Sequence, residues 1–266
     1  MLNITPDSFS DGGNFLSFPQ ALEHAARMID EGADVIEVGG ESTRPGAHPV
    51  AVAEEIGRTV PVIEEILKRW PTTRVAVDTV KAHVAAAAIS AGATIVNDVS
   101  ALRLDPGLAT VCARASSCTL ILMHSRGDVA SMASYNHAVY DEDDVVSAVR
   151  RELAAAAESA LAAGVDRERI ILDPGLGFSK LSAQSVQVLA HLPILLDLGF
   201  QVMVGTSRKR FIGELTGVQK PAERGAGTVG ANVVALTLGA TWFRVHDVGE
   251  NRHALDAAAA ILEARA

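Results

Sequence analysis

Short apolar, β-branched runs that end in polar residues alternate along the chain with alanine-rich stretches of helical period. The apolar runs predict eight strands, at residues 1–4, 35–38, 74–77, 94–96, 119–123, 169–172, 201–204 and 242–245. The stretches between them predict eight helices, near 19–31, 50–69, 81–91, 106–115, 142–163, 184–197, 222–238 and 250–264. Glycines that follow these stretches are typical of helix ends: Gly32, Gly92, Gly164, Gly199 and Gly239.

Continuous apolar strands that alternate with helices are typical of a parallel sheet covered on both faces. Eight such units in about 250 residues favour a (β/α)8 TIM barrel. The main alternative is a doubly wound open sheet, which normally has a G-x-G-x-x-G turn after its first strand. The segment Asn3-Ile4-Thr5-Pro6-Asp7 is not such a turn. No linker or low-complexity tract divides the chain, so we expect one barrel domain over residues 1–266.

The composition and the net charge limit the kinds of partner that the protein could bind. A hydrophobic share of 48% allows a full core, and 23 Lys and Arg against 32 Asp and Glu give a net charge of −9. An acidic chain without a long basic run is not typical of a nucleic-acid binder. An anionic small molecule would need a local cluster of cations.

The two cysteines and the hydropathy pattern bear on metal, redox state and location. Cys112 and Cys118 match no common zinc pattern, and we favour two buried free thiols over a disulfide. No run of about eighteen apolar residues predicts a membrane span, and the first residues lack the features of a signal peptide. We therefore expect a cytoplasmic protein.

Polar or charged residues follow each predicted strand. They are Asn3; Glu37 with the loop 39–46; Asp78 and Thr79; Asn97 and Asp98; His124 to Gly127; Asp173 to Gly175; Ser207 to Arg210; and Arg244, His246 and Asp247. In a barrel these positions meet at one mouth, where the chemistry of the fold collects. Single members of the set could be turn formers or helix caps instead, above all Asp98 and Thr79.

The middle strands supply an acidic group, Asp78, Asn97 and Asp173. Carboxylates and an amide that converge suit a planar heterocycle with several N–H donors. Asp78 and Asp173 could instead be the acid and base of a glycoside hydrolase. That alternative leaves the cations described next unused, and two Trp and two Tyr offer little sugar stacking.

The closing strands supply Arg244 and His246, and the second loop supplies Arg44. These side chains bind anions, and Arg suits bidentate contact with phosphate. Lys209 could serve either group. The two groups together predict a substrate with a donor-rich ring and a phosphorylated tail. A nicotinamide or flavin oxidoreductase on a barrel is an alternative, but no dinucleotide signature supports it.

Five motifs, in this order along the chain, resemble those of the dihydropteroate synthase family. They are Leu2 to Gly13, Gly39 to Gly46, Asp173 to Phe178, Gly205 to Lys209, and Arg244 to Val248. The resemblance implies a TIM barrel that joins 6-hydroxymethyl-7,8-dihydropterin diphosphate to p-aminobenzoate. The products would be 7,8-dihydropteroate and pyrophosphate. It also implies a homodimer, for which an apolar face on the last helix would serve (Ala257, Ala260, Ile261).

The resemblance further implies roles for single residues. The pterin would be bound by Asp78, Asn97, Asp173 and Lys209. Gly205 is also expected to bind substrate, and Met123 and Phe178 could wall the ring pocket, although Met123 is as readily a residue of the barrel core. The diphosphate would be held by Arg44, Arg244 and His246, with Mg²⁺ on Asn3. The p-aminobenzoate pocket would be closed by two loops that carry Phe9, Asp11, Thr43, Arg44 and Pro45. Gly12, Gly13 and Gly40 suggest that these loops are mobile lids.

The charges indicate a dissociative substitution. Asp173, Asp78 and Lys209 on the ring side, with Arg244 and His246 on the diphosphate side, are the expected catalytic residues. Carboxylates favour a pterin-methyl cation, while Mg²⁺ and the cations stabilise the leaving pyrophosphate. Two alternatives share the fold. A corrinoid methyltransferase needs no diphosphate clamp, and a non-catalytic paralogue would be expected to lose Asp173 or Lys209.

Overall fold

The computed structural model describes residues 1–4, 17–44, 46–140 and 144–264. Eight strands within these ranges form a sheet in which each pairs in parallel with the next along the chain. The strands are β1 (Leu2–Asn3), β2 (Val35–Gly39), β3 (Arg74–Asp78), β4 (Ile95–Asp98), β5 (Thr119–Met123), β6 (Ile170–Asp173), β7 (Gln201–Val204) and β8 (Trp242–Phe243). The predicted α/β fold with eight parallel strands is confirmed.

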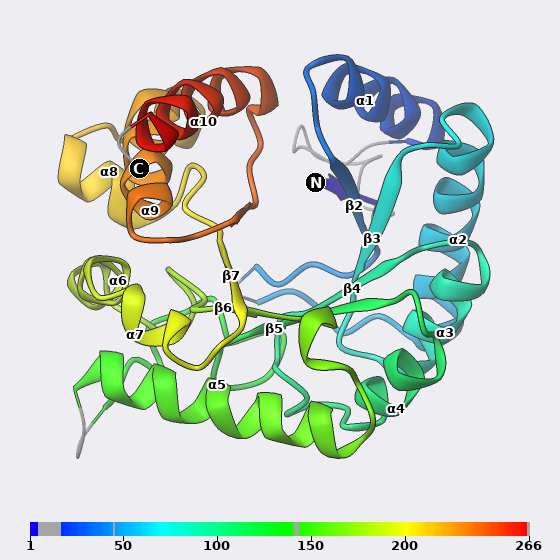
Figure 1. The fold of residues 1–266 in the computed structure, drawn as a ribbon. Helices are drawn as coiled ribbons and strands as arrows, with labels where there is room; N and C mark the ends of the chain where they lie inside the picture. The colour runs from blue at the N-terminus through cyan, green and yellow to red at the C-terminus, as the bar shows by residue number, and fades with distance from the viewer. Residues whose placement is uncertain (5–16, 45, 141–143, 265–266) are drawn as a thin grey trace.

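Helices surround the curled sheet (Figure 1). They are α1 (Phe18–Asp30), α2 (Val52–Arg69), α3 (Ala82–Ser90), α4 (Gly107–Arg114), α5 (Val145–Ala162), α6 (Ser182–Ala190), α7 (Pro193–Leu196), α8 (Arg210–Thr216), α9 (Gly225–Thr237) and α10 (Val248–Glu263). The five predicted helix-ending glycines all have positive φ, a conformation that glycine adopts without strain.

One helix prediction was wrong, and one helix was not predicted. The single helix near 184–197 is two helices, α6 and α7, and the second begins at Pro193. Proline has no N–H to donate within a helix but is well suited to a first turn. The short helix α8 was not predicted, because its first residue, Arg210, belongs to a cationic run that was interpreted as site chemistry alone.

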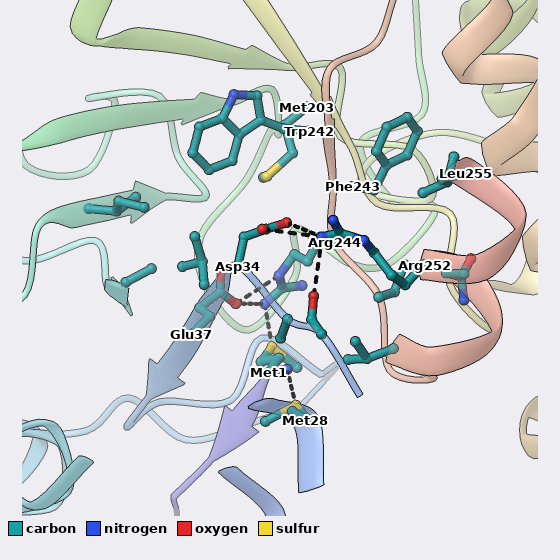
Figure 2. A pocket seen from close by; sticks show the side chains of 18 of the residues that line it. Met1, Met28, Asp34, Glu37, Met203, Trp242, Phe243, Arg244, Arg252 and Leu255 are labelled. Atoms are coloured by element: carbon teal, nitrogen blue, oxygen red, sulfur yellow. Dashed lines mark hydrogen bonds and ion pairs between the residues drawn. The ribbon is translucent and has the colours of Figure 1, made fainter. Parts of the chain in front are cut away.

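The sheet is curled, but its closure is incomplete. Strand β1 pairs only with Val38 and Gly39, the last two residues of β2. Among the described residues, no backbone pairing joins β8 to β1. A cavity of about 190 Å³ lies between the earlier part of β2 and β8 and reaches the side chains inside the sheet (Figure 2). The described part of the chain therefore shows a parallel sheet that curls toward a barrel.

Two further predictions can be compared with the structure. Cys112 and Cys118 are buried free thiols whose sulfur atoms lie 3.9 Å apart, as expected. No helix in the described ranges is both long enough and apolar enough to cross a membrane.

Candidate active site

Strand register brings the predicted site residues to one face. Five buried side chains form a small cluster inside the sheet: Ala76, Ile95, Ile121, Ile171 and Met203. Residues two positions apart on a strand share a face. Two positions after the members of this cluster come Asp78, Asn97, Met123, Asp173 and Gly205. All five therefore face the inside at the carboxyl ends of the strands or just beyond them.

Arg244 links the two ends of the sheet through carboxylates. Its Nε donates to Glu37 Oε1 at 2.7 Å, and both residues are labelled in Figure 2. Its Nη2 donates to Asp78 Oδ2 at 2.9 Å. Asn97 Nδ2 donates to the other oxygen of Glu37 at 3.0 Å. Sequence reasoning placed Glu37 at a strand end but gave it no role. Its position two residues after Val35, which packs against the inner cluster, is the signal that could have found it.

The carboxylates of this network differ in charge. Burial, with the nearby charge of Glu37, raises the pKa of Asp78 to about 7. Burial also opposes the ionisation of Glu37, but the Arg244 guanidinium and the Asn97 amide hold its pKa below the usual range. Near neutral pH Glu37 is therefore ionised, while Asp78 is divided between its two protonation states.

Asn97 keeps an acceptor for a ligand. Its side chain is buried, and its Oδ1 has no hydrogen-bond partner among the described residues. A buried carbonyl oxygen without a partner is costly, so such an atom at a site indicates a ligand donor. An N–H group on a planar ring would satisfy it, as the sequence predicts.

Asp173 and Lys209 form a further part of the site that is predicted to bind a planar ring, which we call the ring site. Asp173 Oδ1 accepts from the Gly175 N–H at 2.7 Å. Lys209 Nζ donates to Leu176 O and lies 4.5 Å from the centroid of the Phe178 ring. Burial raises the pKa of Asp173 and lowers that of Lys209 to about 8. Each group is thus shifted toward its neutral form, although the opposite charge of its neighbour favours ionisation.

Small and apolar side chains shape the same part of the ring site. Met123 and Phe178 belong to one buried cluster. A Cβ on Gly205 would lie 3.8 Å both from Lys209 Nζ and from Arg244 Cβ, so glycine leaves room between these two cations. These three residues lie where a flat ring would be enclosed.

Residues that the sequence predicts to bind an anion lie at a wider opening. A cavity of about 1200 Å³ is lined by Asn3, Arg44, Lys209 and His246, among others. His246 Nδ1 lies 2.9 Å from Ser207 Oγ, which orients the imidazole. Arg44 is exposed to this space. Arg244 is the exception, because the structure ties it to the carboxylates rather than to the opening.

A neighbouring pocket of about 480 Å³ is lined by Thr43, Arg44, Phe178 and Lys209, with others. It adjoins the ring site through Phe178 and Lys209, as a second-substrate pocket should. Phe9, Asp11 and Pro45, which were also expected there, lie outside the described residues, as do Gly12 and Gly13.

The expectation of a mobile lid at Gly40 gains no support. A Cβ there would lie 2.9 Å from Glu55 Cγ and Thr59 Cγ2, so this glycine serves close packing.

Two strand-end residues have local structural contacts. Asp98 accepts from the N–H groups of Ser100 and Leu102 at 2.8 and 2.5 Å. Thr79 Oγ1 accepts from the Lys81 N–H at 3.2 Å within the turn and donates to Glu55 Oε1 on α2 at 2.7 Å. The structure thus supports the alternative interpretation of these two residues as turn-stabilising groups.

The residues present fit Mg²⁺ only if the substrate supplies most of the ligands. Within the described ranges, no group of three His, Cys, Asp or Glu side chains could hold a metal ion. Asn3 is among the residues that line the wide opening, and its side chain carries an amide oxygen. Mg²⁺ commonly takes one or two protein oxygens and completes its shell with phosphates and water. Asn3 fits that pattern.

Comparisons with known proteins agree with this geometry. A family model described as a pterin binding enzyme matches residues 1–246. Dihydropteroate synthase from Bacillus subtilis is 43% identical over 248 residues, which are 93% of this chain and 82% of the relative. The Xanthomonas albilineans enzyme with 4-aminobenzoic acid is 45% identical, has a TM-score of 0.88 and is matched over 98% of this chain and 91% of its own.

A second Xanthomonas albilineans structure, in complex with 7,8-dihydropteroate, is 39% identical with a TM-score of 0.83. The match covers 98% of this chain and 92% of that one. The expected resemblance is thus confirmed along nearly the whole chain, over the strands that carry the ring site and the cationic opening. The chain belongs to the dihydropteroate synthase family of pterin-binding enzymes.

Proposed function

We propose that this protein joins 6-hydroxymethyl-7,8-dihydropterin diphosphate to p-aminobenzoate and releases pyrophosphate, giving 7,8-dihydropteroate. The observation that carries the proposal is the unpartnered Asn97 Oδ1, buried beside Glu37 in the same site as Asp78 and Asp173. A pterin ring offers the N–H donors that these acceptors need. The two Xanthomonas albilineans structures, with 4-aminobenzoic acid and with 7,8-dihydropteroate, support the same reaction.

The substrates divide between the two halves of the site. The ring is bound by Asp78, Asn97 and Asp173, with Lys209 at its edge. The diphosphate extends into the wide opening toward Arg44 and His246. The p-aminobenzoate enters the pocket beside Phe178, which reaches the same Lys209.

Arg244 has a distinct part in this scheme. To contact the diphosphate it gives up its bond to Asp78, and that carboxylate then turns to the ring N–H groups. The exchange leaves Asp78 with hydrogen-bond donors, because the ring N–H groups replace the guanidinium beside it. This step connects binding of the ring to binding of the tail.

The chemistry follows from the placement of charge. The bond from the pterin methylene carbon to the diphosphate oxygen breaks, and its electron pair leaves with pyrophosphate. Asp173 and Asp78 stabilise the positive charge left on the ring, and Arg44, Arg244 and His246 stabilise the anion. The neutral arylamine then forms the new C–N bond and loses its proton to the released pyrophosphate or to solvent. Mg²⁺ held by Asn3 and the diphosphate would supply further electrostatic stabilisation of the leaving group.

The test is release of pyrophosphate from purified protein supplied with the pterin diphosphate, p-aminobenzoate and Mg²⁺. Release that requires the arylamine is the expected result, and omission of Mg²⁺ should slow it. Binding of the pterin without any release would indicate a non-catalytic paralogue. Transfer of a methyl group from a methylated folate would indicate a corrinoid methyltransferase, which the cationic opening disfavours.

We further propose that the curled sheet closes as a (β/α)8 barrel in a single domain. Arg244, just after β8, bonds both to Met1 beside β1 and to Glu37 on β2, so side chains already span the gap. The protein is also proposed to be a cytoplasmic homodimer. Ile261 on α10, whose side chain is 66% exposed, supports an apolar subunit contact, and sedimentation analysis tests the dimer.

A further inference from the structure

Lys180 follows the loop after β6 and is fully buried. Its Nζ lies 2.8 Å from His124 Nδ1. It also donates to the backbone oxygens of Phe178 at 3.1 Å and Gly175 at 3.2 Å. An ammonium has three N–H donors, so these three acceptors satisfy it. A buried lysine is rare unless it is paired in this way.

The contact with His124 continues to helix α5. His124 Nε2 lies 3.0 Å from Glu152 Oε2. Because Nδ1 accepts from Lys180, the proton of the neutral imidazole is assigned to Nε2, where it is donated to the carboxylate. Burial, with the charge of Lys180, lowers the pKa of His124 to about 4, which agrees with a neutral ring. The Lys180 Nζ is therefore connected to α5 through the His124 ring.

The same Nζ of Lys180 also holds the loop that forms the ring site. Gly175 O accepts from the Phe178 N–H at 3.0 Å as well as from Lys180, so the ammonium closes a turn. Gly175 has a φ of +63°, and a Cβ there would lie 1.9 Å from His124 O. This loop supplies the Leu176 oxygen and the Phe178 ring that contact Lys209.

We propose that Lys180 is a positioning residue for the ring site, because its buried Nζ is taken up by three protein acceptors and acts on the pterin through the loop that it holds. Its ammonium fixes the Gly175 and Phe178 carbonyls against His124, and the loop in turn holds Asp173, Phe178 and Lys209 in the arrangement that binds the pterin ring. The inference rests on the proposed function and adds to it a buried residue whose own Nζ contacts are with His124 and two loop carbonyls.

The test compares two substitutions. Lys180→Met keeps the length of the side chain but removes its three donors. Arg169→Met is the matched control, because Arg169 Nη1 donates to three loop oxygens, those of Cys112, Ala115 and Cys118, at 2.9–3.1 Å. Arg169 precedes β6 and so lies at the opposite end of that strand from Asp173. Both variants lose a cation that holds a loop, but only one loop carries the ring site.

Binding of 6-hydroxymethylpterin and of inorganic pyrophosphate with Mg²⁺ is measured by calorimetry, with thermal unfolding alongside. Lys180→Met should weaken pterin binding about tenfold or more, because misplacement of the loop by even 1 Å is costly, and should leave pyrophosphate binding unchanged. Arg169→Met should lower the melting temperature without changing either affinity. Pterin affinity of Lys180→Met within about twofold of wild type would overturn the proposal.

A second variant keeps the test decisive if Lys180→Met does not fold. Glu152→Ala removes the acceptor at the partly exposed far end of the chain of contacts and should weaken pterin binding about threefold, the loss expected of one hydrogen bond. Unchanged affinity in this variant would also count against the proposal. Failure of the wild-type protein to bind the pterin at all would instead remove the proposed function, so the two outcomes are distinguishable.

Discussion

Arg244 and Asp78 are 166 positions apart in the chain, yet the guanidinium Nη2 lies 2.9 Å from the carboxylate Oδ2. The same guanidinium bonds to Glu37, so one cation is shared by two carboxylates. In the absence of substrate this pairing holds the Glu37 and Asp78 side chains close to one guanidinium. It also leaves Asp78 with a raised pKa, because one cation does not fully offset burial and a neighbouring charge.

The raised pKa of Asp78 predicts a pH-dependent stability. The folded protein holds a proton on Asp78 up to about pH 7, whereas the unfolded chain releases it near pH 4. The contribution of Asp78 to the free energy of unfolding therefore falls as the pH rises from about 4 to about 7. Asp78→Asn should remove that fall and be more stable than wild type at pH 8 by on the order of 1 kcal/mol.

Urea unfolding at intervals between pH 4.5 and 8 measures this difference. Asp166→Asn is the control, because Asp166 is 69% exposed and should follow the wild-type profile. Parallel profiles for wild type and Asp78→Asn would show that the pKa of Asp78 is not raised.

Asp173→Asn should keep the fold and lose most turnover. The amide oxygen can still accept from the Gly175 N–H, so the loop is retained. The negative charge that stabilises the ring cation is gone, and loss of one such electrostatic group costs about 100-fold or more in kcat. Circular dichroism checks the fold and pyrophosphate release checks the rate. A near-normal kcat would refute the role of Asp173.

Asn97→Ala should separate stability from binding. The free protein loses the hydrogen bond to the Glu37 carboxylate, at about 1.5–3 kcal/mol, whereas the ring loses the acceptor reserved for it and binds about tenfold more weakly. Asn251→Ala is a matched control, because Asn251 is buried and bonded to Asn232 at 2.9 Å outside the ring site. Titration with 6-hydroxymethylpterin should leave the control unchanged. Equal losses of affinity in both variants would contradict the assignment.

The cavity between β2 and β8 predicts a stabilising substitution. Ala76 is buried on β3 and lines this space of about 190 Å³. Ala76→Val fills part of it with a side chain that suits a strand, and should stabilise by about 0.5–1 kcal/mol. Ala85→Val adds the same atoms at a fully buried position of α3 that does not line this cavity, and should destabilise by about 1 kcal/mol or more. Thermal unfolding of both variants decides the point, and a loss of stability in Ala76→Val would show that the space is not available.

Much of the fold could be predicted from the sequence, because strands of a covered parallel sheet are apolar on both faces and helices repeat every 3.6 residues. The runs at 119–123 and 201–204 coincide with β5 and β7. Residues such as Asp78, Asn97 and Asp173 could be chosen because a strand-end residue follows its apolar run directly. The division between α6 and α7 could also have been found, since Pro193 marks it.

The tertiary structure alone decided which of these groups meet. Glu37 between Arg244 and Asn97, the shared contact of Arg244 with Asp78, and the buried Lys180 beside His124 join residues that are far apart in the chain. Local pattern does not contain such pairs, because they depend on how the curled sheet places the ends of its different strands. Protonation depends on the same long-range packing, since burial and neighbouring charge set each pKa. The sequence by itself determined the strands and the kinds of side chain at their ends, and the curvature of the sheet determined how those side chains pair.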